Sequence, residues 1–246
     1  MRKLIAALAV GAGVFAFGGT SSALAAPCIP TDLVRDGQVL TASLINPPAV
    51  TGDVDAGRCD IGVYVRHATT VIAGAAIHNA RYFGVAVNGS DSSATISSSR
   101  IFHIGDEPHN GSQHGVGIYY VEGATGSIDS THVFDFQKNG TVFTGSGTRV
   151  DITNSEVNGD GPVSFIAQNG IQYSDHSSGT ARGNLVTDIF YTGCSQQDAQ
   201  KTGCTPYVAV GILLYDVDAN AVDTSRNFYR DDQRNLVLVT AQSLGD

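Results

Sequence analysis

A repeated frame of glycine and aliphatic residues constrains the fold of this chain more than any other feature. In the stretch GVAVNGSDSSATISSSRI, Gly84 leads the alternating pair Val85 and Val87, and the aliphatic residues Ile96 and Ile101 follow a short polar turn. The frame begins again at other glycines, namely Gly62, Gly117, Gly140, Gly170 and Gly211. Such self-similarity indicates a solenoid, because one repeat cannot bury its apolar residues alone and stacked repeats can.

The residue types of the frame predict an all-β solenoid. Val, Ile, Tyr and Phe alternate within each short segment, and Gly, Ser, Asn and Asp separate the segments, as in strands joined by turns. We expect about six to seven coils, with the first and third residues after each glycine facing inward. The residue between them then faces outward, and these residues form the row Tyr64, Ala86, Tyr119, Val142, Gln172 and Leu213.

The later part of each repeat predicts how the coils stack. The first aliphatic residue follows its glycine by 10 to 12 residues in every repeat, so the register is tightly held. In the sixth repeat Val222 and Asn227 take the two aliphatic positions, and Leu236 and Leu238 face inward in a last partial coil. Insertions follow coils two, four and five. Polar residues three positions after the first aliphatic residue predict a hydrogen-bond ladder rather than catalytic serines: Ala75, Ser99, Thr131, Ser155, Asn184 and Ser225.

The N-terminal segment has the pattern of an export signal. Arg2 and Lys3 precede an apolar run, and Ala23 to Ala25 form a small-residue cleavage site, so we expect residues 1–25 to be removed. Residues 26–59 do not fit the repeat and are predicted to cap a β-helix domain of residues 60–246. The remaining chain has 12 basic and 23 acidic residues, a net charge of −11. This charge argues against nucleic acid or a membrane surface as partner and favours a secreted protein.

The cysteines of an exported chain predict two disulfides. Cys194 and Cys204 bracket the polar loop SQQDAQKTG, and a bridge there would close its base. Cys28 and Cys59 would then tie the N-terminal segment to the first coil, although two other pairings stay open on spacing alone. No spacing typical of a metal site occurs among the cysteines and histidines, so no metal ligand is assigned.

The frame resembles the right-handed parallel β-helix repeats of the pectate-lyase-like superfamily over residues 60–241. The phrases GSQHGVGIYY, FQKNG and IAQNGIQ resemble a group of exported bacterial β-helix proteins that mostly lack an assigned activity. The resemblance implies the fold. It leaves the activity open, because the superfamily includes polysaccharide lyases, hydrolases, esterases, epimerases, phage tailspikes and adhesins.

Ionisable residues gather at the first insertion, GDEPHNGSQH. Asp106, His109 and His114 lie there, and Lys138 occupies the equivalent side of the next coil. In this hypothesis one histidine is a base, Asp106 orients it and Lys138 stabilises developing negative charge. The predicted polar lining consists of Gln113, Gln137, Asn139, Asp160, Gln168 and Asn169. The alternative is a hydrated loop whose Asp, Asn and Gly residues only make turns. The other histidines are expected at surface positions or strand edges: His67, His78, His103, His132 and His176.

Two classes of function follow. The protein is expected to bind and process an extracellular polysaccharide by lyase, epimerase or hydrolase chemistry, or else to be a non-catalytic carbohydrate-binding or adhesive solenoid. No cofactor is assigned. The row Glu122, Asp175 and Asp216 is the candidate for calcium, although Gly145 interrupts it in coil four.

Overall fold

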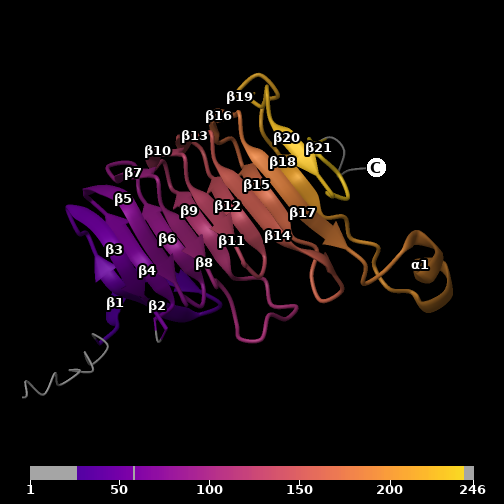
Figure 1. The fold of residues 1–246 in the computed structure, drawn as a ribbon, viewed down its shortest axis with the longest axis horizontal. Coiled ribbons are helices and arrows are strands. Elements are labelled where there is room, and N and C mark those ends of the chain that lie inside the picture. Colours follow the sequence, from indigo (N-terminus) through magenta and orange to yellow (C-terminus); the bar gives the residue numbers. More distant parts are fainter. Residues whose placement is uncertain (1–26, 58, 241–246) are drawn as a thin grey trace, which may run out of the picture.

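The computed structural model describes residues 27–57 and 59–240. The predicted export signal (1–25) and the tail after Ala241 lie outside the described residues. The chain forms a parallel β-helix whose coils follow one another along the long axis, from the N-terminal strands to the C-terminal ones (Figure 1). The all-β prediction is therefore confirmed.

One sheet receives the strand that opens each coil. In the described residues its order is β1 (Ile29–Arg35), β2 (Gln38–Ile45), β4 (Ile61–Arg66), β6 (Phe83–Asn88), β9 (Val116–Val121), β12 (Asn139–Thr144), β15 (Asn169–Ser174), β18 (Val210–Tyr215) and β21 (Leu236–Val239). All neighbours pair in parallel except β1 and β2, which form an antiparallel hairpin.

The second sheet consists of two parallel columns joined through the long strand β5 (Thr69–His78). Within the described part of the chain, one column continues through β7 (Ser93–Ser97), β10 (Thr125–Asp129), β13 (Arg149–Thr153), β16 (Ser178–Arg182) and β19 (Val222–Asp223). The other contains β8 (Arg100–Phe102), β11 (His132–Phe134), β14 (Glu156–Val163), β17 (Leu185–Tyr191) and β20 (Phe228–Arg230). β3 (Ala49–Asp55) pairs with β5, so β2 and β3 form a coil ahead of the first glycine-led one.

The predicted register is confirmed through coil five. Val85 pairs with Ile118 and Val87 with Tyr120. In the second sheet Ile96 pairs with Ile128 and Ile101 with Val133. These side chains are fully buried, and with their equivalents in other coils they form one apolar core along the axis of the helix.

Coil six departs from the prediction. Val186 pairs with Tyr229, so Tyr229 and not Asn227 takes the second aliphatic position, and Val222 pairs with Gly179 instead of Ala181. The reason is the polar ladder: Asn227 Oδ1 accepts from the Asn184 backbone N–H at 2.9 Å. The asparagines therefore stack on each other and shift the register by two residues. Ser225, predicted for this ladder position, lies outside the ladder.

The other ladder positions behave as predicted. Ser99 Oγ accepts from the Ala75 N–H at 3.1 Å, and Ser155 Oγ accepts from the Thr131 N–H at 3.1 Å. Asn184 Oδ1 in turn accepts from the Ser155 N–H at 3.0 Å. These hydroxyls and amides satisfy buried backbone donors where each coil turns, so their role is structural.

The position that leads each coil requires glycine because the neighbouring coil packs too closely for a side chain, and not because the backbone angle is unusual. A Cβ at Gly84 would lie 2.5 Å from Ile101 Cγ2 and 2.6 Å from the carbonyl oxygen of Gly117 in the next coil. The same collision would occur at Gly117 with Val133 and the Gly140 carbonyl. Each frame glycine thus lets the backbone of one coil pack against the next.

The N-terminal hairpin covers part of the outer face of the first sheet. Tyr64, Ala86, Tyr119 and Val142 of the predicted outer row do face away from the main core. They are nevertheless buried, because they form a second apolar cluster with Leu33, Leu40 and Ala42 of the hairpin. Arg35 contacts the hydroxyl of Tyr119, which fixes the end of the hairpin above β9.

Both predicted disulfides are confirmed. Cys28 is bonded to Cys59, and Cys194 is bonded to Cys204, with Cα atoms 5.4 Å and 6.1 Å apart. The second bridge closes the insertion that carries α1 (Gln196–Thr202), which projects from the coils (Figure 1). No helix among the described residues has the length and apolar character needed to span a membrane.

Replacing Ile128 by Ala should lower the free energy of unfolding by about 2–5 kcal/mol, because it leaves a cavity between Ile96 and Ile152. Chemical denaturation measures the change. Val71→Ala is the control, since Val71 is a strand residue of the same sheet with 47% of its surface exposed. Equal stability of the Ile128→Ala and Val71→Ala proteins would contradict the stacking.

Asp232 should make the C-terminal coil sensitive to pH. Burial, with a smaller contribution from the nearby Asp188 and Asp231, outweighs a hydrogen bond from the Ile189 N–H and raises the pKa of this carboxyl from 3.8 to about 7. Below pH 3.8 Asp232 is protonated in both the folded and the unfolded chain. As the pH rises from 3.8 towards 7, the unfolded chain loses this proton while the folded chain retains it, so the stability of the folded protein falls.

We therefore expect Asp232→Asn to raise the melting temperature relative to the natural protein, with a difference that grows from pH 4 to pH 7 and then levels off. Differential scanning calorimetry across this range measures it. A difference that shrinks with rising pH would contradict the assignment.

Candidate functional site

The first insertion is held in place by a buried glutamine. Gln137, fully buried before β12, accepts with Oε1 from the backbone N–H groups of Asp106 and Asn110, both at 3.1 Å. Its Nε2 donates to the carbonyl of Ser112 at 2.9 Å. The Gln137 side chain thus fixes three points of the loop, because a side-chain amide offers both an acceptor and donors, and burial strengthens its hydrogen bonds.

Gln168 has the same role one coil later. It is fully buried, accepts from the Asp160 N–H at 3.1 Å and donates to the carbonyl of Phe136 at 2.6 Å. Gln137 and Gln168 were predicted to line a substrate site. That placement is wrong, because their amide groups form hydrogen bonds with backbone groups and neither side chain reaches the surface.

Asp106 is the centre of the first ionic group. Its carboxylate accepts from Arg81 Nε at 2.9 Å and from Asn110 Nδ2 at 2.8 Å, and its Oδ2 lies 3.0 Å from His114 Nε2. Burial opposes ionisation, but the contacts with Asn110, Arg81 and His114 outweigh it and lower the pKa of Asp106 to about 2. His114 is buried and its ring stacks on Tyr82 at 4.4 Å. The predicted pairing of Asp106 with a histidine is therefore present, and that histidine is His114.

His109 belongs to a second group. Its Nδ1 lies 3.0 Å from Asp160 Oδ2, and its Nε2 lies 3.8 Å from Asp135 Oδ1. Burial lowers the pKa of His109, but the two carboxylates outweigh it, so the net shift is upward. The pKa of Asp135 is also raised, first by burial and then by the negative charges of Asp160 and Glu107. His103, which was expected at a surface position or a strand edge, contacts the other oxygen of Asp135.

The backbone explains why His103 and Asp135 meet. Both have a left-handed conformation, with φ of 52° and 51°, at the corner where each coil leaves its second aliphatic residue. Asn79, Asp188 and Asp231 have positive φ at the equivalent corner of other coils. Asn, Asp and His tolerate this conformation better than most residues, and stacking brings the corner side chains of neighbouring coils together.

Lys138 is separated from His109. It is half-buried, its Nζ donates to the carbonyl of Ala167 at 2.8 Å, and burial lowers its pKa. It lines a groove of about 360 Å³ on the outer face of the first sheet, which we call the hairpin groove. The groove is lined by Arg35, Asp36, Tyr82, Phe83, Gln113, His114, Val116, Tyr119, Lys138, Asn139, Val142 and Gln172.

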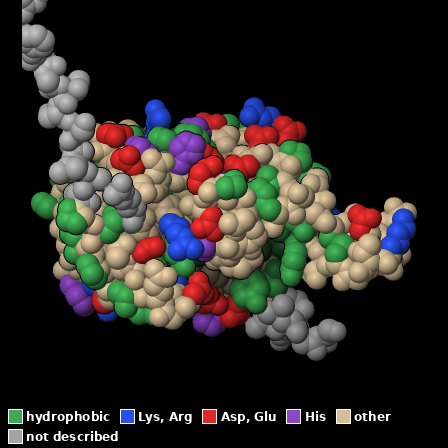
Figure 2. Space-filling model, turned by 90° about the horizontal axis from the view of Figure 1, so that it is seen from below, with side chains coloured by type: hydrophobic (Ala, Val, Ile, Leu, Met, Phe, Trp, Pro, Cys, Tyr) green, Lys and Arg blue, Asp and Glu red, His purple; other side chains and the backbone are tan. Residues whose placement is uncertain are grey.

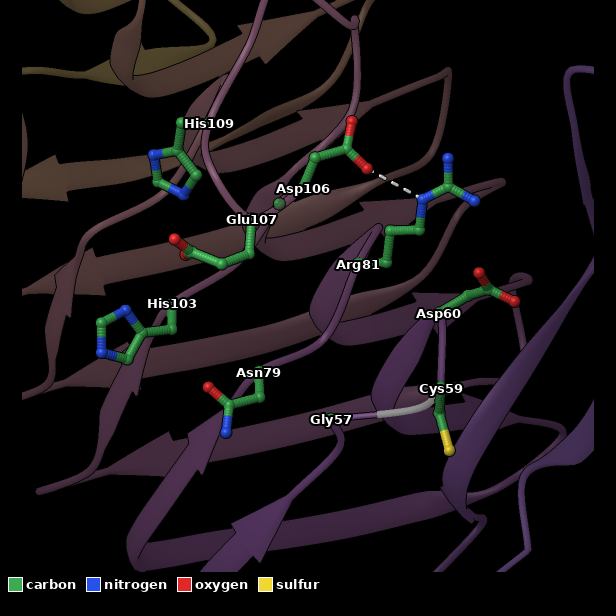
Figure 3. Close-up of a pocket in the computed structure, with 10 residues that line it drawn as sticks. Gly57, Cys59, Asp60, Asn79, Arg81, His103, Asp106, Glu107 and His109 are labelled. Atoms are coloured by element: carbon green, nitrogen blue, oxygen red, sulfur yellow. Dashed lines mark hydrogen bonds and ion pairs between the residues drawn. The ribbon is translucent and has the colours of Figure 1, made fainter.

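A second depression, which we call the corner hollow, lies on the other side of the insertion. It has a volume of about 540 Å³ and is lined by Gly57, Cys59, Asp60, Asn79, Arg81, His103, Gly105, Asp106, Glu107 and His109. Figure 3 shows Arg81 directed at Asp106 on one side of this hollow, with His103 and His109 on the other. Seen from the side on which the insertions project, acidic, basic and histidine side chains gather beside a depression (Figure 2).

The structure thus divides the predicted site into two. Gln113, His114, Lys138 and Asn139 line the hairpin groove, whereas Asp106 and His109 line the corner hollow. Asp160 is exposed, contacts His109 at 3.0 Å and lines neither depression. Asn169 is buried with its amide 3.5 Å from Gln172 Oε1. The single cluster expected from sequence does not form, because the insertion is a wall whose two faces present different residues.

The candidate calcium row has another explanation. Glu122, Asp175 and Asp216 all have positive φ, between 52° and 57°, at the end of their strands. Their carboxylates pair separately, with Arg66, Thr144 and His176. Local turn conformation accounts for these residues without an ion.

Stacked parallel strands, a continuous apolar core and polar insertions on one side define a β-helix protein with surface sites formed by its loops. The family model described as "Right handed beta helix region" matches residues 54–225, and the chain belongs to this family. Among solved structures, it is similar to the crystal structure of pectate lyase Pel9A, at 13% sequence identity and a TM-score of 0.46. The match covers 77% of this chain and 50% of that one, so the chain spans about half the length of that protein. No curated protein matches the sequence.

Gln137→Ala should loosen the first insertion without disrupting the coils. It would leave the N–H groups of Asp106 and Asn110 without their acceptor, at a cost of about 1–3 kcal/mol. Hydrogen exchange monitored by mass spectrometry should show faster exchange within residues 105–115. Gln113→Ala is the control, because Gln113 is exposed and its Nε2 donates at 3.4 Å to the carbonyl of Gly111 within its own loop. Equal exchange in the two variants would contradict the anchoring role.

Proposed function

We propose that this protein is exported and binds an acidic extracellular polysaccharide in the hairpin groove. The observation that carries the proposal is the convergence of Gln113, His114, Lys138 and Asn139 on one groove beside aromatic residues. Concave sites with apolar walls and a few directed polar groups are typical ligand-binding sites. The two disulfides support an oxidising, extracellular environment.

The walls of the groove suit a sugar ring. Phe83 and Tyr119 stack with their ring centroids 4.7 Å apart and, with Val142, supply an apolar floor. Asn139 Nδ2 donates to Gln172 Oε1 at 2.8 Å, which orients both amides at the same edge. Hydroxyl groups of a sugar can exchange hydrogen bonds with such amides while a ring face covers the apolar floor.

The charge of the groove favours an anionic sugar. Arg35 and Lys138 contribute two positive charges, and Asp36 is the acidic residue of the lining. This contrasts with the whole chain, whose net charge is −9. Burial disfavours the charged form of Lys138. A uronate carboxylate bound beside this half-buried side chain would stabilise the charged form through a charge-assisted hydrogen bond.

The same groove favours one catalytic alternative. A lysine whose pKa is lowered by burial can act as a base, and Lys138 shares the groove with His114, which Asp106 orients. Lys138 would take the proton beside the uronate carboxylate, the glycosidic bond on the adjacent carbon would break, and the leaving sugar oxygen would take a proton from His114 or water, which gives an unsaturated product. Lyase activity is thus the second candidate, and the appearance of such products separates it from binding alone.

Affinity electrophoresis against polygalacturonate and alginate, with dextran as the neutral comparison, tests the proposal. Lys138→Met should weaken binding to the acidic polymers by at least about tenfold, because it removes the cation and keeps the volume of the side chain. Lys201→Met is the matched control, since Lys201 lies on α1 and does not line the groove.

The melting temperature must be measured alongside. Loss of Lys138 should also lower stability, because its Nζ donates to the Ala167 carbonyl and the side chain is half-buried. Undiminished binding by Lys138→Met at a temperature where it is folded, or an equal loss in Lys201→Met, would refute the groove as the binding site.

A further inference from the structure

His109, Asp135 and Asp160 come from three different segments and face one small space. One imidazole nitrogen and one oxygen from each carboxylate lie within 4.8 Å of one another. We propose that these three side chains form a binding site for a divalent first-row transition metal ion, with Zn²⁺ as the representative ion. The site is separate from the hairpin groove, because none of the three lines that groove.

The donor set decides the class of ion. Calcium and magnesium prefer oxygen ligands alone, whereas an imidazole with carboxylates suits zinc and its neighbours. Zinc binds nitrogen and oxygen at about 2.0–2.2 Å, so the ligands of a tetrahedral ion lie about 3.4 Å from one another. His109 Nδ1 faces Asp160 at 3.0 Å, and its Nε2 faces Asp135 at 3.8 Å. One nitrogen of His109 and one oxygen of each carboxylate lie within 4.8 Å of one another, so side-chain movements of about 1 Å would bring these three atoms to the distances around one ion.

Further residues hold the ligands in position, as in metal sites generally. His103 contacts the Asp135 oxygen that faces away from His109. Gln168 Nε2 lies 3.2 Å from Asp160 Oδ2, and the same glutamine fixes the Asp160 backbone. Asp135 itself lies in the stacked row of corner residues, where the left-handed backbone restricts its direction.

The charges around the cluster also favour a cation. The groups that act most strongly on Asp135 are His103, Asp160, His109 and Glu107, so three acids face two imidazoles. Arg81, the basic residue of the adjoining corner hollow, is already paired with Asp106 at 2.9 Å. A divalent ion would neutralise the negative charge of the three acids that the two imidazoles do not balance.

The cysteines do not compete for the ion. Cys28, Cys59, Cys194 and Cys204 are all bonded in disulfides, so none offers a thiolate. Sequence spacing could not indicate the site, because its ligands come from the first insertion, the corner after β11 and the strand β14. Loaded with an ion, the cluster would connect these segments and stiffen the wall between the two depressions.

Isothermal titration calorimetry of the mature, untagged protein with ZnCl₂ tests the proposal. We expect one Zn²⁺ per chain, a loss of affinity of about 10- to 100-fold in Asp135→Asn and Asp160→Asn, and weaker binding of CaCl₂ and MgCl₂. His67→Ala is the matched control, because His67 forms an exposed pair with Asp91 at 2.6 Å outside the cluster. Its affinity for Zn²⁺ should equal that of the natural protein.

Three results would overturn the assignment. They are unchanged Zn²⁺ affinity in the aspartate variants, an equal loss in His67→Ala, or tighter binding of Ca²⁺ than of Zn²⁺. Thermal unfolding in a chelator establishes that each variant is folded before titration. If Asp135→Asn does not fold, His109→Gln gives the same test, because it removes the imidazole from the insertion and changes no residue of the coils.

Discussion

The in-register contact between successive coils is the constraint on which the rest of the structure depends. At each frame glycine the carbonyl oxygen of the next coil lies so close that a Cβ would collide with it. Each aliphatic residue stacks on its equivalent in the next coil. Hydrogen bonds of the parallel ladders satisfy the backbone, while the enclosed side chains supply the hydrophobic free energy. Positions that repeat in sequence thereby become neighbours in space, including polar ones.

Polar residues use this stacking in three distinct ways. The hydroxyl and asparagine ladder satisfies backbone donors inside the turns, and in coil six it overrides the apolar frame. The buried Gln137 and Gln168 fasten insertions to the coils. The left-handed corner row projects His103 and Asp135 side by side towards the insertions. The functional candidates depend on the last two, because an insertion without an anchor would not hold its side chains in one place.

Separation of the two depressions explains why one mechanism cannot include all the ionisable residues. The insertion 105–115 presents His114 to the hairpin groove, while Asp106 and His109 face the corner hollow. Asp106 nevertheless contacts His114 at 3.0 Å across this wall, so the two faces share one ionic contact.

The sequence by itself determined the solenoid and the inward positions of coils one to five, because these follow from strict alternation and repeat length. The cysteine spacing favoured the two observed disulfides but left two other pairings open, and the structure decided between them. The sequence could not place Asn227, since a hydrogen-bond ladder competed with the apolar pattern. Tertiary structure alone decided that Gln137 is an anchor, that Lys138 and His109 lie apart, and that His109 meets Asp135 and Asp160. These contacts join side chains from different coils, and the path of each insertion between the coils is set by packing and not by any local pattern.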